Sequence, residues 1–366
     1  MAKGALLAAH LGGHHSHDHS HPHGRGGAAP EYAAPLVELS RGGLTESLHR
    51  GAVAVCTPDG RRARGLGHPA MPTFLRSTAK PLKALALITS GAADALGLEP
   101  AELACACGSL NGEDFQVEAV KSILAKAGLG PEALDCGIHR PSHRPTALAL
   151  KRAGEEPTPL HNNCAGKHAA MLALCRHLGH PIQDYIQPRH PVQVLILQTV
   201  AKLCAYPAEQ IGLGIDGCGV PVFRLPLIAL AGAYARLARP EEADLDSQTK
   251  EGLARLLEAC LAHPEMIAGT GRLCTRLMQA APGAVLAKTG AEGSYALALP
   301  GLGLGVAFQV EDGAMRALGP VACEVLHQLG VLDHQALEGP LADLHQPVLK
   351  NHRGQEVARL VPALHL

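Results

Sequence analysis

The sequence has no tryptophan, and its 366 residues include only four phenylalanines and five tyrosines. A hydrophobic core must therefore consist mainly of Leu, Ala and Val. The net charge is close to zero, since the chain has 32 Lys and Arg and 33 Asp and Glu. No basic stripe is interleaved with aromatic residues, so a nucleic-acid partner is not expected.

The chain also lacks an apolar run near the roughly 18 residues of a membrane-spanning helix, so no membrane partner is expected. Residues 1–11 contain one Lys and a short apolar stretch broken by His10, without the cleavage site of a secretory signal. The 11 cysteines are odd in number and scattered. They do not indicate a disulfide framework, and we predict a cytoplasmic protein.

Residues 10–23 carry 7 histidines among Gly and Ser. Such a segment cannot bury apolar surface, so we expect residues 1–30 to be disordered. Its composition favours weak binding of divalent metals. A metal-binding protein or metallochaperone is therefore one alternative function.

Short apolar runs bounded by Gly and Pro predict strands near both ends of the folded region, with helical periodicity between them. The expected strands cover residues 37–39, 51–56, 62–66, 283–287, 294–299 and 305–310. Helical patterns run from residue 81 to about 278, and residues 317–329 predict a closing helix.

These elements predict an α/β (α+β) fold in which the N- and C-terminal strands form one antiparallel sheet with a helical subdomain inserted between them. The sheet would use residues 35–70 and 283–330, and the helical part residues 80–280. We expect one domain over residues 31–335, followed by a C-terminal extension, 336–366. A cleft is expected where the sheet meets the helices.

Ser77 and Lys80 form an S-x-x-K pair that can carry nucleophilic chemistry. Positions i and i+3 share one helix face, so the lysine can act as the base that a serine hydroxyl needs. Pro81 follows directly, and the residue before a proline disfavours helical angles. Ser77 should therefore lie at or just before the start of the helix.

Two further motifs strengthen this interpretation, because Ser109 and Asn111 form an S-x-N and Lys288 begins a K-T-G. These motifs, in this order, are the signature of serine β-lactamases and penicillin-binding proteins. A second lysine close to Lys80 would lower its pKa, because like charges disfavour double protonation.

A third cluster contains cysteines in Gly-rich surroundings, with Cys164 in residues 161–168 and Cys218 in residues 214–219. Two thiols joined by a carboxylate or a histidine can bind Zn²⁺, although the spacing is not that of an ordinary zinc motif. Buried thiols in tight loops are the alternative, and both readings stay open.

Taken together, the motifs resemble the Rhizobium etli-type (class 3) L-asparaginases, which share the serine β-lactamase-like fold. The resemblance extends from about residue 35 to 330. It rests on residues 75–81 (LRSTAKP), 109–113 (SLNGE), 161–168 (HNNCAGKH), 214–221 (GIDGCGVP) and 288–293 (KTGAEG). Leu110 departs from the family, where His is more usual, and the histidine-rich segment lies outside it.

The resemblance implies hydrolysis of L-asparagine by two Ser–Lys pairs, Ser77 with Lys80 and Ser109 with Lys288. Lys80 would take the proton of Ser77, and Ser109 would pass one to the leaving ammonia. The backbone N–H groups of Ser77 and Ala291 are candidates for binding the oxyanion. A homodimer is also implied.

The resemblance further implies a Zn²⁺ site formed by Cys164, Lys167 and Cys218. Five further residues are expected to contact or position the substrate. These residues are Arg76, Asn111, His168, Asp216 and Glu292. Arg76 has an alternative role in a structural ion pair. A glutaminase, or another serine amidohydrolase such as a β-lactamase or peptidase, remains the alternative enzyme.

Overall fold

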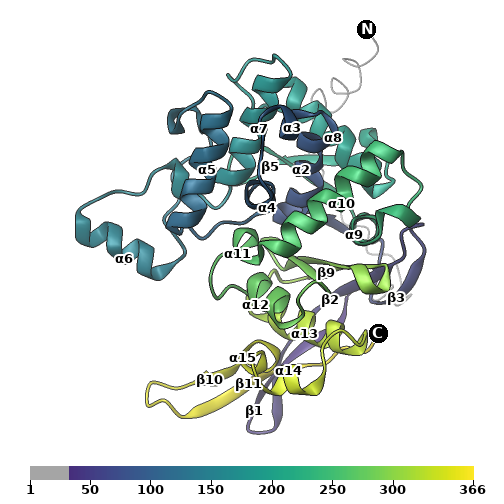
Figure 1. The fold of residues 1–366 in the computed structure, drawn as a ribbon. Coiled ribbons are helices and arrows are strands. Elements are labelled where there is room, and N and C mark those ends of the chain that lie inside the picture. The colour runs from purple at the N-terminus through teal and green to yellow at the C-terminus, as the bar shows by residue number, and fades with distance from the viewer. Residues whose placement is uncertain (1–32) are drawn as a thin grey trace, which may run out of the picture.

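An eight-stranded antiparallel sheet forms the base of the molecule, as seen in the computed structural model, which describes residues 33–366 (Figure 1). The histidine-rich segment predicted to be disordered lies outside the described residues. The strands are β1 (Ala34–Arg41), β2 (Leu44–Cys56), β3 (Arg62–Leu66), β7 (Leu286–Thr289), β8 (Ser294–Leu299), β9 (Leu304–Val310), β10 (Val348–Lys350) and β11 (Glu356–Pro362).

The strand order is β10-β11-β1-β2-β9-β8-β7. β3 pairs with the end of β2, from Val53 to Cys56, beyond the part of β2 that pairs with β1. The N-terminal strands join β7–β9 through the pairing of β2 with β9, where Gly51 pairs with Val310 and Cys56 with Gly305. All of β8 and the second half of β2 are buried, so both faces of the sheet centre are covered. The predicted single sheet from N- and C-terminal strands is confirmed.

The sheet extends further than predicted, because two strands come from the segment expected to be a C-terminal extension. β11 pairs with β1, with Leu39 opposite Leu360, and β10 pairs with β11. Ala358 and Leu360 are buried on one face while Arg359 between them is exposed, which is the alternation of an edge region of a sheet. Residues 348–362 therefore belong to the sheet.

Helices fill the middle of the sequence, and Figure 1 shows most of them above the sheet. They are α2 (Lys80–Thr89), α3 (Ala92–Ala95), α4 (Pro100–Cys107), α5 (Asp114–Lys126), α6 (Arg144–Ala153), α7 (Ala165–His177), α8 (Pro191–Cys204), α9 (Leu227–Ala238), α10 (Ser247–Ala262), α11 (Pro264–Ile267) and α12 (Leu273–Ala280). In α8 the buried residues recur every three or four positions, as at Val192, Ile196 and Val200. Among residues 33–366, no helix is both long and apolar enough to cross a bilayer.

Three more helices follow the last strand of the sheet centre: α13 (Leu318–Gln328), α14 (His334–Glu338) and α15 (Ala342–His345). The predicted closing helix corresponds to α13, which packs against β1 and β11. α14 and α15 lie beside β10 and β11 at the end of the molecule away from the helical part (Figure 1).

A second, three-stranded sheet was not predicted from the sequence. It contains β4 (Pro72–Phe74), β6 (Pro221–Pro226) and β5 (Gly212–Ile215), in that order. Each strand is short and contains Gly or Pro, so its period-2 pattern is too brief to recognise. This sheet positions the segment before Ser77, because the Leu75 N–H donates to the Phe223 carbonyl at 2.9 Å.

Helix α9 rests directly on the main sheet, where it packs on β9, β8 and β2. The contact depends on Gly305 in β9. A Cβ at this position would lie 2.1 Å from both the carbonyl oxygen of Ala231 and the amide nitrogen of Ala235. Backbone cannot move aside as a flexible side chain can, so only glycine fits here.

We predict that Gly305→Ala lowers the free energy of unfolding by about 1–3 kcal/mol or more, because the methyl group would push α9 off the sheet. Chemical denaturation monitored by circular dichroism measures the change. Gly301→Ala is the matched control, since nothing lies within 4 Å of a Cβ there. Equal stability of the two variants would contradict the close packing of α9.

Candidate active site

Ser77 lies in a short 3-10 helix, η1 (Arg76–Ala79), that leads directly into α2. The Lys80 N–H donates to the Ser77 carbonyl, so the two residues are one tight helical turn apart. Lys80 is helical, with φ −60° and ψ −45°, even though Pro81 follows it. Pro81 occupies the first turn of α2, where its missing N–H costs nothing. Ser77 therefore lies just before the helix, as the sequence predicts.

Arg76 holds an unusual backbone conformation immediately before Ser77. Its φ is 49°, in the left-handed region that a residue with a side chain seldom adopts. Its guanidinium donates to Asp216 Oδ1 at 3.0 Å, and Asp216 is nearly buried in the turn after β5. This ion pair, one of the two roles considered for Arg76, anchors the strained residue to the small sheet.

The hydroxyl of Ser109 lies between two buried lysines. Lys288 Nζ is 2.7 Å from Ser109 Oγ, and Lys80 Nζ is 3.2 Å from it. Lys80 also donates to the carbonyls of Gly108 at 2.7 Å and Asn163 at 2.9 Å. The structure thus brings together three of the four predicted catalytic side chains in one hydrogen-bonded chain.

The two lysines differ in their surroundings. Burial and the nearby charge of Lys80 lower the pKa of Lys288 to about 7. Lys288 has only Ser109 Oγ and the Thr289 carbonyl, at 3.0 Å, as acceptors. Near neutral pH Lys288 can therefore lose its proton and become an acceptor for the Ser109 hydroxyl.

A cavity of about 330 Å³ contains the remaining catalytic candidate, Ser77. Within residues 33–366 the Ser77 hydroxyl makes no hydrogen bond, and neither do the backbone N–H groups of Ser77 and Ala291. Both residues line the cavity, so it is bordered by residues with a free hydroxyl and two free backbone donors. The other lining residues are Ser109, Asn163, Ala268, Arg272, Leu273, Cys274, Lys288, Thr289, Gly290, Met315 and Leu318.

A second cavity of about 410 Å³ adjoins the first at Ala291, which lines both. Arg76 and Glu292 line this second cavity rather than the one that contains Ser77. Glu292 also has a positive φ of 56° in the turn between β7 and β8.

Asn111 is set apart from both cavities. Its side chain is buried against Gly269, where a Cβ would lie 2.2 Å from the Asn111 Cγ atom. Its N–H donates to Gln116 Oε1 at 3.0 Å, and its own Oδ1 has no partner among the described residues. In this structure Asn111 packs the Ser109 turn against the loop before α12.

The cysteine cluster adjoins Lys80, because Cys164 follows Asn163, whose carbonyl accepts from Lys80. Lys167 Nζ is 3.0 Å from Cys218 Sγ and 3.9 Å from Asp216 Oδ2. A hydrogen bond from Cys218 and the charge of Lys167 hold the pKa of the Cys164 thiol well below its usual range. Burial alone would lower the pKa of Lys167, but the nearby thiols and Asp216 outweigh it and raise that pKa.

These donors suit a zinc ion, although within residues 33–366 no three His, Cys, Asp or Glu side chains converge as a metal site. Cys164 and Cys218 would supply two sulfur ligands, and Lys167 would have to supply the third. Both the Cys218 thiol and the Lys167 ammonium would have to lose a proton to bind. The donor chemistry therefore fits Zn²⁺ with an open fourth position.

His168 follows Lys167 but is fully enclosed. Its Nδ1 atom is 2.7 Å from the Tyr185 hydroxyl, and its buried Nε2 atom has no partner among the described residues. Burial and the charge of Lys167 hold the pKa of His168 well below its usual range. His168 is therefore neutral, and it lines neither cavity described above.

Sequence reasoning missed several residues of the Ser77 cavity. Cys274 Sγ is 2.9 Å from Thr289 Oγ1 and accepts the Thr289 N–H at 3.1 Å, so it fixes the residue after Lys288. Cys274 and Arg272 lie at the start of α12, far from any recognised motif. Thr289 could have been found, since it belongs to the K-T-G segment.

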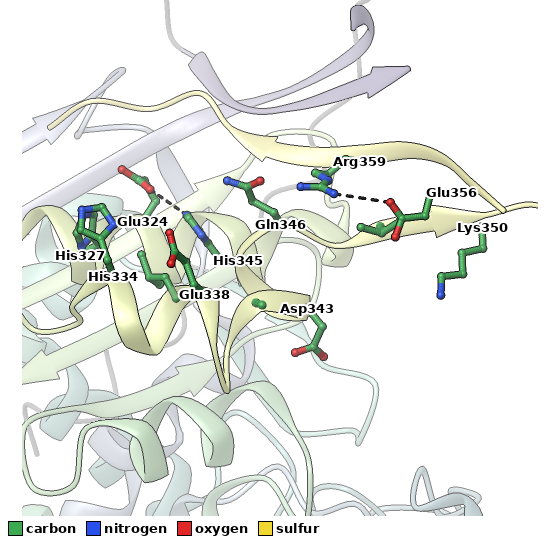
Figure 2. A pocket seen from close by; sticks show the side chains of 13 residues that line it. Glu324, His327, His334, Glu338, Asp343, His345, Gln346, Lys350, Glu356 and Arg359 are labelled. Atoms are coloured by element: carbon green, nitrogen blue, oxygen red, sulfur yellow. Dashed lines mark hydrogen bonds and ion pairs between the residues drawn. The ribbon is translucent and has the colours of Figure 1, made fainter. Parts of the chain in front are cut away.

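A larger cavity, of about 870 Å³, lies elsewhere, between α13, α14, α15 and the β10–β11 hairpin (Figure 2). Several of its charged groups pair with one another or with neighbours. His345 Nε2 is 3.1 Å from Glu324 Oε2, and Arg359 is 3.7 Å from Glu356. Asp343 is bound by Arg276. It contains no serine or cysteine, so it offers no nucleophile of the kind found at Ser77.

We predict a pH-dependent effect of Lys288→Met on stability. The pKa of Lys288 falls from 10.5 to about 7 on folding, so between these values the unfolded chain binds more protons and stability rises with pH. The variant lacks this penalty, and its gain in free energy of unfolding over the wild type should be larger at pH 7 than at pH 10. Lys350→Met, on the exposed β10, is the control. A gain independent of pH would contradict the lowered pKa.

Comparison with known proteins gives one match over most of the chain. A profile of the family described as L-asparaginase II matches residues 37–362. No match is found among curated proteins.

Two solved structures illustrate the remote similarities. A β-lactamase from Mycobacterium bovis has 15% identity over 77% of this chain and 95% of that chain, with a TM-score of 0.39. The protein Mglu in its native form has 15% identity over 81% of this chain and 69% of that chain, with a TM-score of 0.35. Both TM-scores are low, so neither protein bears on the function of this chain.

Proposed function

Because the chain belongs to the L-asparaginase II family, a family of amidohydrolases, we propose that it hydrolyses L-asparagine to L-aspartate and ammonia. The observation that carries this proposal is the cavity that gathers Ser77, Ser109 and Lys288 from three distant segments. One hydroxyl in it is free, and the other is held by two lysines. Such a site suits acyl transfer through a serine ester.

Ser77 is the nucleophile of this mechanism. Its hydroxyl attacks the carbon of the side-chain amide and forms a tetrahedral intermediate. The negative charge on the oxygen is stabilised by the N–H groups of Ser77 and Ala291, which have no other partner among the described residues. Donors fixed before the reaction stabilise this charge without having to reorganise.

Lys80 takes the proton of Ser77 and at the same time passes one of its own to Ser109. Its three acceptors match the three N–H groups of an ammonium, so it begins the step charged. Ser109 in turn gives its proton to Lys288, which has a pKa of about 7 and can begin the step neutral. The net result is the transfer of one proton from Ser77 to Lys288.

The proton then returns along the same path to complete the reaction. Lys288 donates through Ser109 and Lys80 to the amide nitrogen, the C–N bond breaks, and ammonia leaves a β-aspartyl ester on Ser77. Water attacks this ester and gives its proton to the same lysines. The ester bond breaks, aspartate leaves, and Ser77 regains its hydrogen.

Zn²⁺ is the proposed cofactor, held by Cys164, Lys167 and Cys218. When bound, the ion would act as a Lewis acid that orients a polar group of the substrate. His168 and Asp216 adjoin this cluster and are proposed to support it. Asn111 and Glu292 are also proposed to contribute to substrate binding. Asn111 would do so by fixing the Ser109 turn.

A glutaminase is the second candidate, because glutamine carries the same amide on a side chain one methylene longer. A pocket discriminates one methylene by only about 1–3 kcal/mol, so side activity on glutamine is expected. The proposal also includes a homodimer located in the cytoplasm, as expected from the sequence.

We predict that Ser77→Ala lowers kcat/KM for asparagine by roughly a thousandfold or more, because no other hydroxyl in the cavity is free. Ammonia release from asparagine and glutamine, with nitrocefin as the β-lactamase substrate, measures the loss. Ser122→Ala in α5 is the control. An active Ser77→Ala enzyme would rule out Ser77 as nucleophile. If the wild type hydrolysed nitrocefin but neither amide, the protein would be a β-lactamase rather than an asparaginase.

We predict that Cys218→Ala, made in a chain lacking residues 1–27, abolishes the bound zinc and raises KM for asparagine. Metal analysis by mass spectrometry after dialysis measures the content. Cys175→Ala removes a buried thiol away from the cluster and should retain the metal. If Cys218→Ala leaves both zinc content and KM unchanged, the metal site is wrong. Metal retained only with residues 1–27 present would assign it to the histidine-rich segment.

A further inference from the structure

The Ser77 cavity has an uneven charge. Two cations, Arg272 and Lys288, line it, whereas none of its lining residues is Asp or Glu. Lys288 is committed to Ser109 and can be neutral near pH 7. Arg272 is therefore the one lining residue with a permanent positive charge.

The guanidinium of Arg272 is largely unused by the protein. It forms no ion pair with any residue between 33 and 366, and its one hydrogen bond, to Ser142 Oγ, is long at 3.4 Å. Arg76 is the opposite case, since Asp216 neutralises it and it lines the adjacent cavity. Of the two arginines, Arg272 is the one with free donors at the cavity that contains Ser77.

We propose that Arg272 binds the α-carboxylate of the amino acid substrate and so sets the specificity of this site. An arginine offers two parallel N–H groups that match the two oxygens of a carboxylate. Arg272 is the N-cap residue of α12, and the next two residues, Leu273 and Cys274, line the cavity with it. Its backbone is therefore fixed at the cavity edge. This inference rests on the proposed hydrolysis of asparagine.

The proposal divides the roles of the two arginines. Arg272 holds the carboxylate end of the substrate while the side-chain amide lies at Ser77. Arg76 acts as a positioning residue, because its ion pair with Asp216 holds the left-handed turn that presents Ser77. An amide without a carboxylate would lose the contact with Arg272 and keep everything else.

The test compares two substrates that differ in one group. β-Alaninamide is asparagine without its α-carboxylate, and it keeps both the amine and the reacting amide. Arg272→Gln should raise KM for asparagine roughly ten- to a hundredfold, as expected for loss of a hydrogen bond between charged groups, with a smaller effect on kcat. It should leave kcat/KM for β-alaninamide unchanged. Arg272→Lys should fall between wild type and Arg272→Gln.

Two controls separate charge from structure. Arg353→Gln removes an exposed arginine from the turn between β10 and β11 and should change nothing. Ser142→Ala removes the hydrogen bond of Arg272 and should leave KM for asparagine near that of the wild type. An unchanged KM in Arg272→Gln, an equal loss for both substrates, or an equal effect of Ser142→Ala would overturn the proposal.

A binding measurement distinguishes failure of this inference from failure of the proposed function. Calorimetry with L-aspartate needs no turnover. Wild-type protein should bind it, and Arg272→Gln should bind it at least tenfold more weakly. If the wild type releases no ammonia from asparagine, the proposed function fails whatever Arg272 does. Equal binding of aspartate by both proteins would refute the role of Arg272 alone.

Discussion

The hydrogen bonds of the Ser109 hydroxyl to two buried lysines are the constraint on which the rest of the structure depends. Lys80 comes from α2, Lys288 from β7 and Ser109 from the turn after α4, so helical subdomain and sheet must both be in place. Burial, together with the charge of Lys80, holds the pKa of Lys288 near 7. The fold therefore favours a neutral Lys288 beside Ser109 above this pH.

Holding these groups in place costs stability, and the structure offsets the cost locally. The carbonyls of Gly108 and Asn163 accept from Lys80, so its charge is buried with partners rather than alone. The strained backbone of Arg76 is held by Asp216 from the small sheet. The strained backbone and the buried charge persist at this site because strands from distant parts of the sequence hold the surrounding residues in place.

The sequence was most informative where the candidate residues belong to short motifs of neighbouring residues. The motifs at Ser77, Ser109 and Lys288 predicted residues that do meet, the alternation of strands and helices predicted the main sheet, and the asparaginase resemblance is confirmed at the family level. The small sheet was missed because its strands are too short to show a period. The roles of Arg272 and Cys274 depend on where α12 begins relative to β7, a tertiary relation that no local pattern records.

In the proposed mechanism, the role of the second serine follows from the cation-rich surroundings of the site. Burial and the charge of Lys167 also lower the pKa of Lys83, to about 7, so a second positive charge is disfavoured beside Lys167. In the proposed relay Lys80 begins charged, so it cannot keep a further proton from Ser77. Passing a proton through Ser109 to the neutral Lys288 places the added charge near the developing oxyanion, whose negative charge offsets the repulsion between the two lysines. The second hydroxyl thus connects two lysines that are charged together only while the oxyanion is present.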